Sequence, residues 1–431
     1  MTDDLMKSSG SRDAGNSTHA DEQRLYPKVR FRGFDEPWKK VKLEEISERV
    51  NGNDNRFNLP VLTISAKTGW MTQEDRFSGD ISGKQKKNYT LLHKGELSYN
   101  HGNSKVAKYG AVFSLQNYSE ALIPHVYHSF KIIKETTPVF IENFFKKKDV
   151  NKQLRKYISS SARMDGLLNI SYSDFMKVHL FISQKISETK QIDKIFEILN
   201  SLLSLQQRKL ELENQLKQFN LQNLFSDEQR LYPKVRFRGF DEPWKKVKLG
   251  RNVKRIRRKN KNLETNIPLT ISAQFGLVDQ RDFFGRVVAS ENLANYILLK
   301  RGEFAYNKSY SKEAPYGSIK RLEKYNEGAL STLYIAFTPE NINSDFLKAF
   351  FDTTKWYSHI VQVSTEGARN HGLLNISPQD FFEMSITIPK SDEQNNISRI
   401  YNLMNSLLSL QQQDINTTQQ LKQFLLQNLF I

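Results

Sequence analysis

The sequence predicts a mixed α/β fold, with two similar globular domains, each followed by a long helix, and with the two helices paired as a coiled coil. Three observations support this prediction. The segment Asp21–Leu43 returns letter for letter at Asp227–Leu249, so the chain is one unit written twice. Runs of β-branched and aromatic residues bounded by turn signals, such as Leu62–Ala66, predict short strands. A long stretch without Pro or Gly closes each unit and predicts a helix.

The repeat continues in weaker form through the rest of each unit. Asn88–Asn100 (NYTLLHKGELSYN) returns as Asn295–Asn307 (NYILLKRGEFAYN), and the GLLNIS of Gly166–Ser171 returns at Gly372–Ser377. With roughly 200 residues each, the repeats are too long for a solenoid, whose units run about 20–50 residues. We therefore interpret the chain as a pseudo-dimer with a rough two-fold relation, the alternative being a duplication without functional symmetry. The predicted organisation is a disordered polar tail at 1–20, a first domain at 21–186, a first long helix at 187–225, a second domain at 226–390 and a second long helix at 391–431.

Both predicted helices carry apolar residues in steps of three and four, which is typical of one apolar stripe. The stripes are Ile192, Ile195, Leu199, Leu202, Leu205, Leu212, Leu216 and Phe219, and Ile397, Ile400, Met404, Leu407, Leu410, Leu421 and Phe424. At 1.5 Å per residue each helix would be roughly 60 Å long. One small domain cannot bury so long a stripe, so we expect the two stripes to pair. The alternative is that each helix packs on its own domain.

Two sites in the globular parts predict shorter helices. Ser171 and Asp174 have the spacing of an N-cap and its third helical position, just after an apolar LLNI run. Ser377 and Asp380 repeat this spacing, with Pro378 at the first helical position.

The composition restricts the classes of function. There are 64 Lys and Arg against 47 Asp and Glu, for a net charge of +17, and no cysteine. Disulfides, cysteine-based zinc sites and a cysteine nucleophile are therefore excluded. No apolar stretch approaches the roughly 20 residues of a membrane span, and the first 20 residues lack the apolar core of a signal peptide, so we expect a cytoplasmic protein without membrane contact.

The positive charge is not spread evenly along the chain. The predicted helix 187–225 has equal numbers of acidic and basic residues, and neither the second helix nor the tail has a basic excess. The excess therefore lies on the two globular domains, as expected for two modules that each bind nucleic-acid backbone. The nearly pure charge of Lys254–Lys261 is typical of phosphate contact.

Polar, glycine-containing loops supply the candidate DNA-binding side chains. Asn, Gln, Arg and Lys are the residue types that pair with base edges in the major groove. The candidates are Lys84, Lys86, Lys87, Asn100, Asn103, Lys105 and Arg163 in the first domain, and Lys308, Ser309, Tyr310, Lys312, Arg369, Asn370 and His371 in the second. The alternative for Arg369 and Asn370 is that they cap a helix or a turn.

Signatures of catalysis are absent from the sequence. There is no phosphate-binding G-x-x-x-x-G-K-[ST], no G-x-G-x-x-G and no G-x-S-x-G. His125 and His128 are the only close histidine pair and lack a third ligand, so we expect no metal site. The acidic residues are interleaved with basic ones rather than clustered as two-metal chemistry requires. We predict a non-catalytic protein without a cofactor.

Several motifs together resemble the specificity subunit of type I restriction–modification enzymes. They are Tyr306–Ser311, Tyr316–Arg321, Gly367–Ile376, Pro389 with Glu393 and Gln394 before Ile397, and the closing Leu-Gln-Asn-Leu-Phe. The resemblance implies two target-recognition domains, each reading half of a split double-stranded DNA site, held apart by an antiparallel coiled coil. It also implies two methyltransferase (modification) subunits and two restriction (translocase and nuclease) subunits as partners. S-adenosylmethionine, ATP and Mg²⁺ would belong to those partners, which perform adenine methylation and restriction.

The first half departs from the family motifs at two loops. It has Tyr99–Ser104 and Ser161–Gly166 where the second half has YNKSYS and GARNHG. Such divergence fits two different half-sites. Two other functional classes stay open: a duplicated scaffold with assembly helices and incidental charge, and a monomeric nuclease that would cut DNA in the presence of metal.

Overall fold

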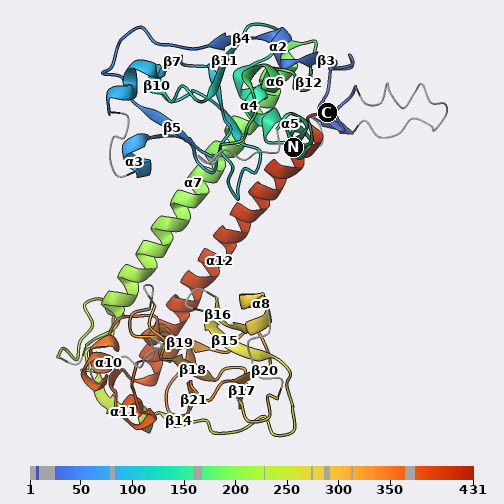
Figure 1. Ribbon diagram of the computed structural model, residues 1–431. Helices are drawn as coiled ribbons and strands as arrows, with labels where there is room; N and C mark the ends of the chain where they lie inside the picture. The colour runs from blue at the N-terminus through green and yellow to red at the C-terminus, as the bar shows by residue number, and fades with distance from the viewer. Residues whose placement is uncertain are drawn as a thin grey trace. The chain divides into compact units, whose positions relative to one another are not determined.

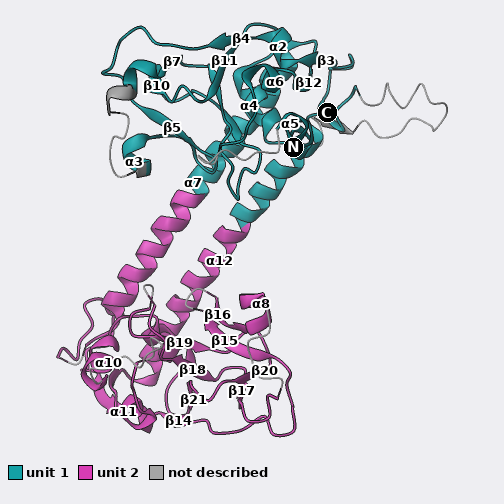
Figure 2. Cartoon of the chain, viewed as in Figure 1, with its two compact units in different colours: residues 1–206, 414–431 teal, residues 207–413 magenta. Residues whose placement is uncertain are grey.

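The computed structural model describes residues 6–8, 25–77, 83–158, 167–227, 229–272, 275–285, 292–311, 314–364 and 374–431, with side chains from residue 25 onward except at 77 and 83–85. The chain forms two compact units (Figure 2), residues 1–206 with 414–431 (unit 1) and residues 207–413 (unit 2). The division passes through both long helices, α7 (Ile186–Leu224) and α12 (Ser391–Asn428). Each unit therefore contains one globular part and a portion of each long helix.

The two globular parts repeat one order of elements (Figure 1). Unit 1 has β2 (Val29–Phe31), β3 (Lys39–Lys42), α2 (Leu43–Ile46), β4 (Ser47–Val50), β5 (Leu62–Ser65), β6 (Gly69–Thr72), α3 (Gln73–Phe77), η1 (Gly83–Asn88), β7 (Thr90–His93), β8 (Leu97–Asn100), β9 (Ala111–Ser114), β10 (Glu120–Ile123), β11 (His128–Ile132), α4 (Pro138–Phe145), α5 (Lys148–Tyr157), α6 (Tyr172–Met176) and β12 (His179–Ile182). Unit 2 has β13 (Lys245–Lys248), η2 (Leu249–Arg251), β14 (Val253–Arg255), β15 (Pro268–Ser272), β16 (Gly276–Asp279), α8 (Gln280–Phe284), β17 (Ile297–Lys300), β18 (Phe304–Asn307), β19 (Ser318–Arg321), β20 (Glu327–Leu330), β21 (Ile335–Pro339), α9 (Ser344–Phe351), α10 (Tyr357–Val363), α11 (Pro378–Phe382) and β22 (Ser385–Ile388).

The sheets are mostly antiparallel and have the same central order in both units. Unit 1 has the sheet β4-β11-β8-β9, and unit 2 has its equivalent β14-β21-β18-β19. Unit 2 adds β16-β15-β20-β17, in which β15 and β20 are parallel, while in unit 1 the corresponding strands pair as β5-β6 and β10-β7. With helices covering these sheets, the mixed α/β class is confirmed.

The two sequence-predicted N-caps are present. The side chain of Ser171 accepts a hydrogen bond from the backbone N of Asp174 at 3.0 Å, and that of Ser377 accepts one from Asp380 at 3.1 Å. Pro378 occupies the first turn of α11. Each cap satisfies one of the amide groups that a helix start leaves without an intrahelical partner.

The long helices pair antiparallel within each unit. In unit 1, Lys422 donates to the side chain of Asn200 at 2.6 Å. In unit 2, Lys217 donates to Asn405 at 2.8 Å. Residue numbers therefore rise along α7 as they fall along α12. The long helices predicted from the sequence are confirmed.

The surface through which the helices pair differs from the predicted stripe. The side chains that are less exposed alternate in steps of four and three, the spacing of a coiled-coil seam. On α7 they are Ile192, Phe196, Leu199, Leu203, Gln206, Leu210, Glu213, Lys217, Asn220 and Leu224, and on α12 they are Ile397, Tyr401, Met404, Leu408, Gln411, Ile415, Thr418, Lys422, Leu425 and Leu429. The sequence analysis missed this seam because polar members such as Gln206, Glu213 and Thr418 interrupt the apolar pattern.

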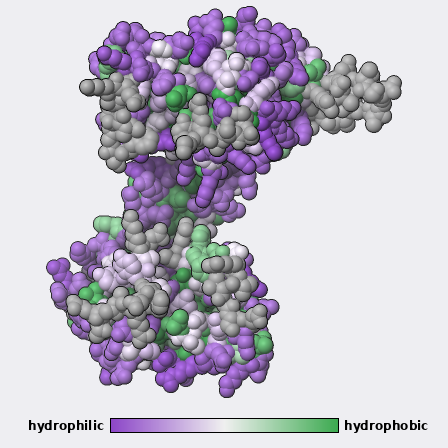
Figure 3. Space-filling model, in the orientation of Figure 1, coloured by the Kyte–Doolittle hydropathy of each residue, from purple (hydrophilic) through white to green (hydrophobic). Residues whose placement is uncertain are grey.

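Most of the predicted stripe is exposed instead. Of the stripe residues, Ile192, Leu199 and Ile397 are buried, but Leu202, Leu205, Leu212, Leu216 and Phe219 on α7 are exposed, as are Leu407, Leu410, Leu421 and Phe424 on α12. With Ile198 and Leu403, which are also exposed, they form an outer ridge on each helix. Apolar surface is visible along the helices in the space-filling view (Figure 3). The prediction that the helices pair is therefore confirmed. The prediction of which residues pair them was wrong except at Ile192, Leu199, Ile397 and Met404, which lie in the seam.

The far end of each long helix completes the core of a globular part. In unit 1, Leu425, Leu426 and Leu429 are buried with the globular core, and the ring of Phe430 lies 4.8 Å from that of Phe140. In unit 2, Leu221 and Leu224 join the core, and Phe225 lies 5.1 Å from Phe346. Each unit therefore needs the end of the helix that belongs to the other half of the sequence.

The start of each long helix is fixed by a buried ion pair. Arg30 donates to both carboxylate oxygens of Glu188 at 2.6 and 2.9 Å, and the indole of Trp38 donates to the same carboxylate at 3.1 Å. In unit 2, Arg236 binds both oxygens of Glu393 at 2.8 and 2.9 Å. Both arginines belong to the letter-for-letter repeat, and both make the same two-pronged bond to a glutamate, but Trp244 does not repeat the hydrogen bond of Trp38.

The N-terminal tail was expected to be disordered. Met6–Ser8 instead form β1, which pairs antiparallel with Val29–Phe31. The correction has a simple reason: a ladder of backbone hydrogen bonds to an available strand does not depend on apolar side chains. The rest of the tail lies outside the described residues.

Candidate nucleic-acid interface

One loop in each unit holds several of the predicted DNA-binding residues on a shared frame. It runs from residue 101 to 110 between β8 and β9 (the β8–β9 loop) and from 308 to 317 between β18 and β19 (the β18–β19 loop). The side-chain oxygens of Asn100 and Asn307 each accept the amide of the residue two positions later at 3.0 Å. The hydroxyls of Ser104 and Ser311 each accept an alanine amide at 3.0 Å.

The loops also close in the same way. Gly110 and Gly317 have φ values of +79° and +81°. A Cβ atom at Gly110 would lie 2.5 Å from the carbonyl oxygen of Asn100, and one at Gly317 would lie 2.2 Å from that of Asn307. Only glycine fits these positions, because both the backbone conformation and the close approach exclude a side chain.

Different side chains stand at equivalent places on this common frame. Asn103 and Lys105 are exposed in the β8–β9 loop. Tyr310, at the position equivalent to Asn103, is exposed in the β18–β19 loop, while Ser309 is half-buried. Asn100 donates its amide to the carbonyl of Ile64 at 3.1 Å, so its side chain shapes the loop base. The common frame can therefore present two different sets of polar groups.

Each loop is attached to the segment that follows a second candidate loop. In unit 1, the backbone N of Leu168 donates to the carbonyl of His101 at 2.8 Å. In unit 2, the backbone N of Leu374 donates to the carbonyl of Lys308 at 2.9 Å. The candidates Arg163, Arg369, Asn370 and His371 precede these attachments in sequence, but they lie outside the described residues, as does Lys312.

The remaining candidates lie on η1 and are anchored elsewhere in unit 1. The side chain of Asn53 donates to the carbonyls of Lys86, Lys87 and Tyr89 at 3.3, 3.1 and 2.7 Å. Lys87 is exposed and Lys86 is half-buried. Lys84 lies on the same turn, but its side chain lies outside the described residues.

Two contacts at the loop bases escaped the sequence analysis. The buried ring of His101 lies between two backbone carbonyls and stacks on the ring of His128, with the ring centroids 4.9 Å apart. Lys308, predicted to contact DNA, also donates to the carbonyl of Ile376 at 3.3 Å. The only sequence signal was that a histidine and a lysine occupy the same place in the repeat.

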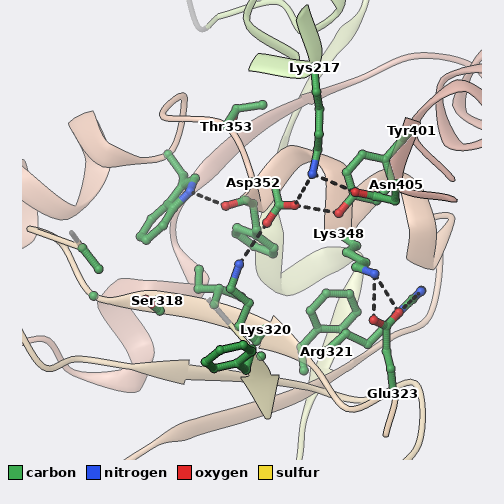
Figure 4. Close-up of a pocket in the computed structure, with 18 of the residues that line it drawn as sticks. Lys217, Ser318, Lys320, Arg321, Glu323, Lys348, Asp352, Thr353, Tyr401 and Asn405 are labelled. Carbon is green, nitrogen blue, oxygen red and sulfur yellow. Dashed lines mark hydrogen bonds and ion pairs between the residues drawn. The ribbon is translucent and has the colours of Figure 1, made fainter. Parts of the chain in front are cut away.

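Unit 2 also contains a polar pocket of about 480 Å³ between its globular part and its portions of the long helices (Figure 4). Asp352 is at its centre: Lys320 donates to one carboxylate oxygen at 3.1 Å and Tyr401 to the other at 2.6 Å. Lys217 lies 3.7 Å from the same carboxylate. Lys348 donates to both oxygens of Glu323 at 2.8 Å.

The charged groups of this pocket, together with their burial, shift one another's pKa values. Burial opposes the ionisation of Asp352, but Lys320 and Tyr401 outweigh it, and the pKa of Asp352 lies below its usual range. Burial lowers the pKa of Lys217, and Asp352 partly offsets this. Burial and the adjacent Asp352 raise the pKa of Tyr401. Each cation in the network has an internal partner. Because Lys217 and Tyr401 of the long helices both contact Asp352 of the globular part, the network attaches the helices to that part.

Metal and membrane features were searched in the same part of the chain. Among the described residues, no group of three or more His, Cys, Asp or Glu side chains could hold a metal ion. No described helix is both long enough and apolar enough to cross a membrane.

Comparison with known proteins finds similarity at the level of structure. No protein-family model and no curated protein matches the sequence. The S subunit of a type I restriction–modification system from M. genitalium matches with a TM-score of 0.54 at 14% identity, over 94% of this chain and 99% of that one. A chain from a structure of complex assembly and conformational transition in the type I R-M system matches with a TM-score of 0.52 at 14% identity, over 91% of this chain and 97% of that one. The chain therefore has the fold of such S subunits.

Proposed function

We propose that this chain is the DNA-recognition subunit of a type I restriction–modification enzyme. The observation that carries the proposal is the pair of loops with one backbone frame and different exposed side chains, on two globular parts of one fold. Two such modules can read two different half-sites of one double-stranded DNA target. The basic charge of the globular parts supports the proposal, because contacts to phosphate supply much of the affinity for DNA.

Asn103 and Tyr310 are the central reading positions of this proposal. They are equivalent and exposed, and each is held by a loop base that uses the same asparagine, serine and glycine. Lys87, Lys105 and Ser309 lie on the same modules and add backbone or base contacts. The predicted roles of Lys84, Lys86, Asn100, Arg163, Lys312, Arg369, Asn370 and His371 stay part of the proposal, with Asn100 acting through the loop shape.

The catalytic steps are assigned to partner subunits. Methyltransferase subunits would supply S-adenosylmethionine chemistry, and restriction subunits would supply ATP- and Mg²⁺-dependent translocation and cutting. The chain itself is proposed to be non-catalytic and to act in the cytoplasm. In purified form it should neither methylate nor cut DNA.

The outer ridges support two equivalent docking sites for the methyltransferase subunits. In unit 1 the ridge comprises Ile198, Leu202, Leu205, Leu421 and Phe424. In unit 2 the equivalent positions are Leu403, Leu407, Leu410, Leu216 and Phe219, with Leu212 in addition. Exposed apolar patches of this kind mark interaction sites. Because the two sets are related by the sequence repeat, one kind of partner can bind to both.

The test is to express the chain with a methyltransferase partner and to map methylated adenines by sequencing. The expected result is one split site with two unlike halves, and no methylation by either protein alone. Asn103→Ala should relax only one half of the site and Tyr310→Ala only the other, each at a cost of about 1–3 kcal/mol for the cognate base. Methylation without this chain, or a change in both halves from one substitution, would refute the proposal.

A further inference from the structure

We propose that His101 and Lys308 are equivalent positioning residues, each holding its loop to the neighbouring segment by a positive charge. In unit 1 that charge depends on the second proton of an imidazole, so the DNA half-site read by unit 1 should be bound in a pH-dependent way. The inference rests on the proposed function, because it takes the two loops as DNA-reading elements.

The geometry of His101 requires a doubly protonated ring. Its Nδ1 lies 2.7 Å from the carbonyl oxygen of Leu168, and its Nε2 lies 2.8 Å from that of Val126. A carbonyl oxygen only accepts hydrogen bonds, while a neutral imidazole has a single N–H. Both contacts are hydrogen bonds only when both ring nitrogens carry protons. Loss of one proton would place a lone pair against a carbonyl oxygen in a buried site.

The groups packed around His101 do not supply the charge themselves. His128 stacks on it, and burial lowers the pKa of His128 to about 4, so His128 is neutral at higher pH. Tyr99 lies 6.0 Å away, centroid to centroid, and burial raises its pKa. Behind His128, burial raises the pKa of Tyr172 to about 12, and Arg49 lies 4.5 Å above the Tyr172 ring. None of these described neighbours is a carboxylate, and the described partners of the His101 ring nitrogens are the two carbonyls.

In unit 2 the loop is held by a side chain that stays charged at all pH values considered, that of Lys308. Lys308 takes the place of His101, and its ammonium group donates to the carbonyl of Ile376. In unit 1 the equivalent carbonyl, that of Ile170, accepts from His128 at 3.0 Å. The strand registers place His128 opposite Tyr99 and Ile335 opposite Tyr306, so Ile335 replaces His128 in unit 2. Two histidines therefore do in unit 1 what one lysine does in unit 2.

The two side chains respond differently to pH. Histidine changes its charge between pH 5 and 8, whereas lysine keeps its charge there. As pH rises through that range, the β8–β9 loop loses one charged hydrogen bond and the β18–β19 loop loses none. A hydrogen bond to a charged group is worth enough to change affinity by about tenfold or more.

The experiment uses the full chain and the split site mapped by methylation. Binding is measured at constant ionic strength from pH 5.5 to 8.5 on two duplexes, one with only the first half-site intact and one with only the second. Affinity for the first half-site should fall by about tenfold as pH rises, while affinity for the second should stay level. Equal pH profiles for the two halves would overturn the inference.

Matched variants exchange the two arrangements. The double variant His101→Lys with His128→Ile should bind the first half-site with a level profile, and Lys308→His with Ile335→His should make the second half-site pH-dependent. Melting curves verify that each variant is folded. If the first variant is unstable, the second still decides, and a folded variant that keeps the wild-type profile contradicts the inference.

The failures of the two proposals are distinguishable. If methylation mapping yields no split site, the proposed function fails before any pH profile is recorded. If the site is found, Asn103→Ala and Tyr310→Ala affect separate halves, and the profiles are nonetheless equal, only the positioning role of the charges fails. Nuclear magnetic resonance of ring-labelled histidine, with His101→Lys used for assignment, adds a direct readout: the signal that is missing in the variant should show loss of the second ring proton over the pH range in which affinity for the first half-site falls.

Discussion

Units 1 and 2 hold their long helices and their loops by the same kinds of contact, but the loops carry different side chains. Arg30 with Glu188 and Arg236 with Glu393 fix the starts of the long helices in nearly the same geometry. The loop frames also agree, down to the glycine that closes each loop. At the loop tips and bases, however, the repeat has Asn103 in unit 1 where unit 2 has Tyr310, and His101 where unit 2 has Lys308. The comparison teaches that the two units share the contacts that hold helices and loops in place and differ in the side chains at the loop tips, where the proposed DNA contacts lie.

A second difference concerns charge at the junction between helices and globular parts. In unit 2, Asp352 ends α9 and Lys348 lies within it, whereas unit 1 has Lys146 and Glu142 at the equivalent places. The acidic and the basic residue have thus exchanged positions between the two units. Lys217 in unit 2 and its equivalent in unit 1, Lys422, are nevertheless both lysines that bind an asparagine of the other helix. The contacts between the two helices are thus more alike in the two units than the charges of the globular parts on which the helices pack.

The largest effect should come from breaking the shared attachment. Glu188→Ala would leave Arg30, which is 4% exposed, buried without its partner and should destabilise unit 1 by about 3–5 kcal/mol. Glu393→Ala should cost less in unit 2, because Arg236 is 15% exposed and can be rehydrated. Hydrogen exchange read separately for the two units measures both values. Equal losses would mean that burial of the arginine does not control the strength of the attachment.

The next effect concerns whether one unit can replace the other. A chain of residues 21–225 keeps one globular part and α7, whose end could complete the core of a second copy as α12 completes unit 1. At the seam, this places Asn220 where Leu425 is buried, and Glu213 where Thr418 is buried. Burial of the Asn220 amide should cost about 1–3 kcal/mol, and burial of the Glu213 carboxylate should cost more. We therefore expect a weak two-fold dimer that Asn220→Leu strengthens, measured by analytical ultracentrifugation.

With the methyltransferase partner, that dimer should methylate an inverted repeat of the first half-site, because symmetry gives both halves the same reader. Leu212→Thr is the matched control. Leu212 differs from its equivalent Thr417, but it is exposed on the outer ridge, so this change should leave the dimer unaffected. A monomer even with Asn220→Leu would show that the helices pair only as unlike partners. Methylation of the asymmetric site by the half-length chain would contradict the division of reading between units.

A smaller effect is a difference between the two units in how their stability depends on pH. Burial raises the pKa of Asp193 to about 6, and its hydrogen bond from Thr137 only partly offsets this. A carboxyl group whose pKa is raised on folding stabilises the fold below its unfolded pKa of about 4 and loses that contribution as pH rises to about 6. Unit 1 should therefore lose about 2–3 kcal/mol between pH 4 and 7.

Asp193→Asn should remove this pH dependence and stabilise unit 1 at pH 8. In unit 2 the equivalent tie is neutral, since Ser398 donates to Asn343 at 2.9 Å. Ser398→Ala should therefore change stability without changing its pH dependence. Urea unfolding at a series of pH values tests both variants, and a pH-independent effect of Asp193→Asn would contradict the assignment.

The smallest effect on stability should come from the outer ridges. Leu205→Gln in unit 1 and Leu410→Gln in unit 2 alter side chains that are 69% and 60% exposed, so each should change stability by less than about 0.5 kcal/mol. Each should nevertheless weaken binding of one methyltransferase subunit, measured by the mass of the assembled complex. Leu408→Gln is the control in the seam, where the change should lower stability. Unchanged assembly with both ridge variants would move the docking site elsewhere.

The sequence alone determined the duplication, the fold class, both long helices and the caps at Ser171 and Ser377. These features depend on local periodicity and on short-range spacing, which the order of residues records directly. The polar loops Asn100–Lys105 and Asn307–Lys312 were also predicted, because polar residues follow apolar strands there, whereas their role in DNA binding stays a prediction.

The tertiary structure decided which surfaces meet. A helix with several apolar rows can turn any of them inward, and only the opposite helix selects the seam with Leu203, Leu210 and Ile415 over the ridge with Leu205 and Leu410. The tie between His101 and Leu168 likewise joins residues far apart in the chain. Burial and hydrogen-bond partners across such distances set the roles of these side chains, and neither quantity is encoded in local residue order.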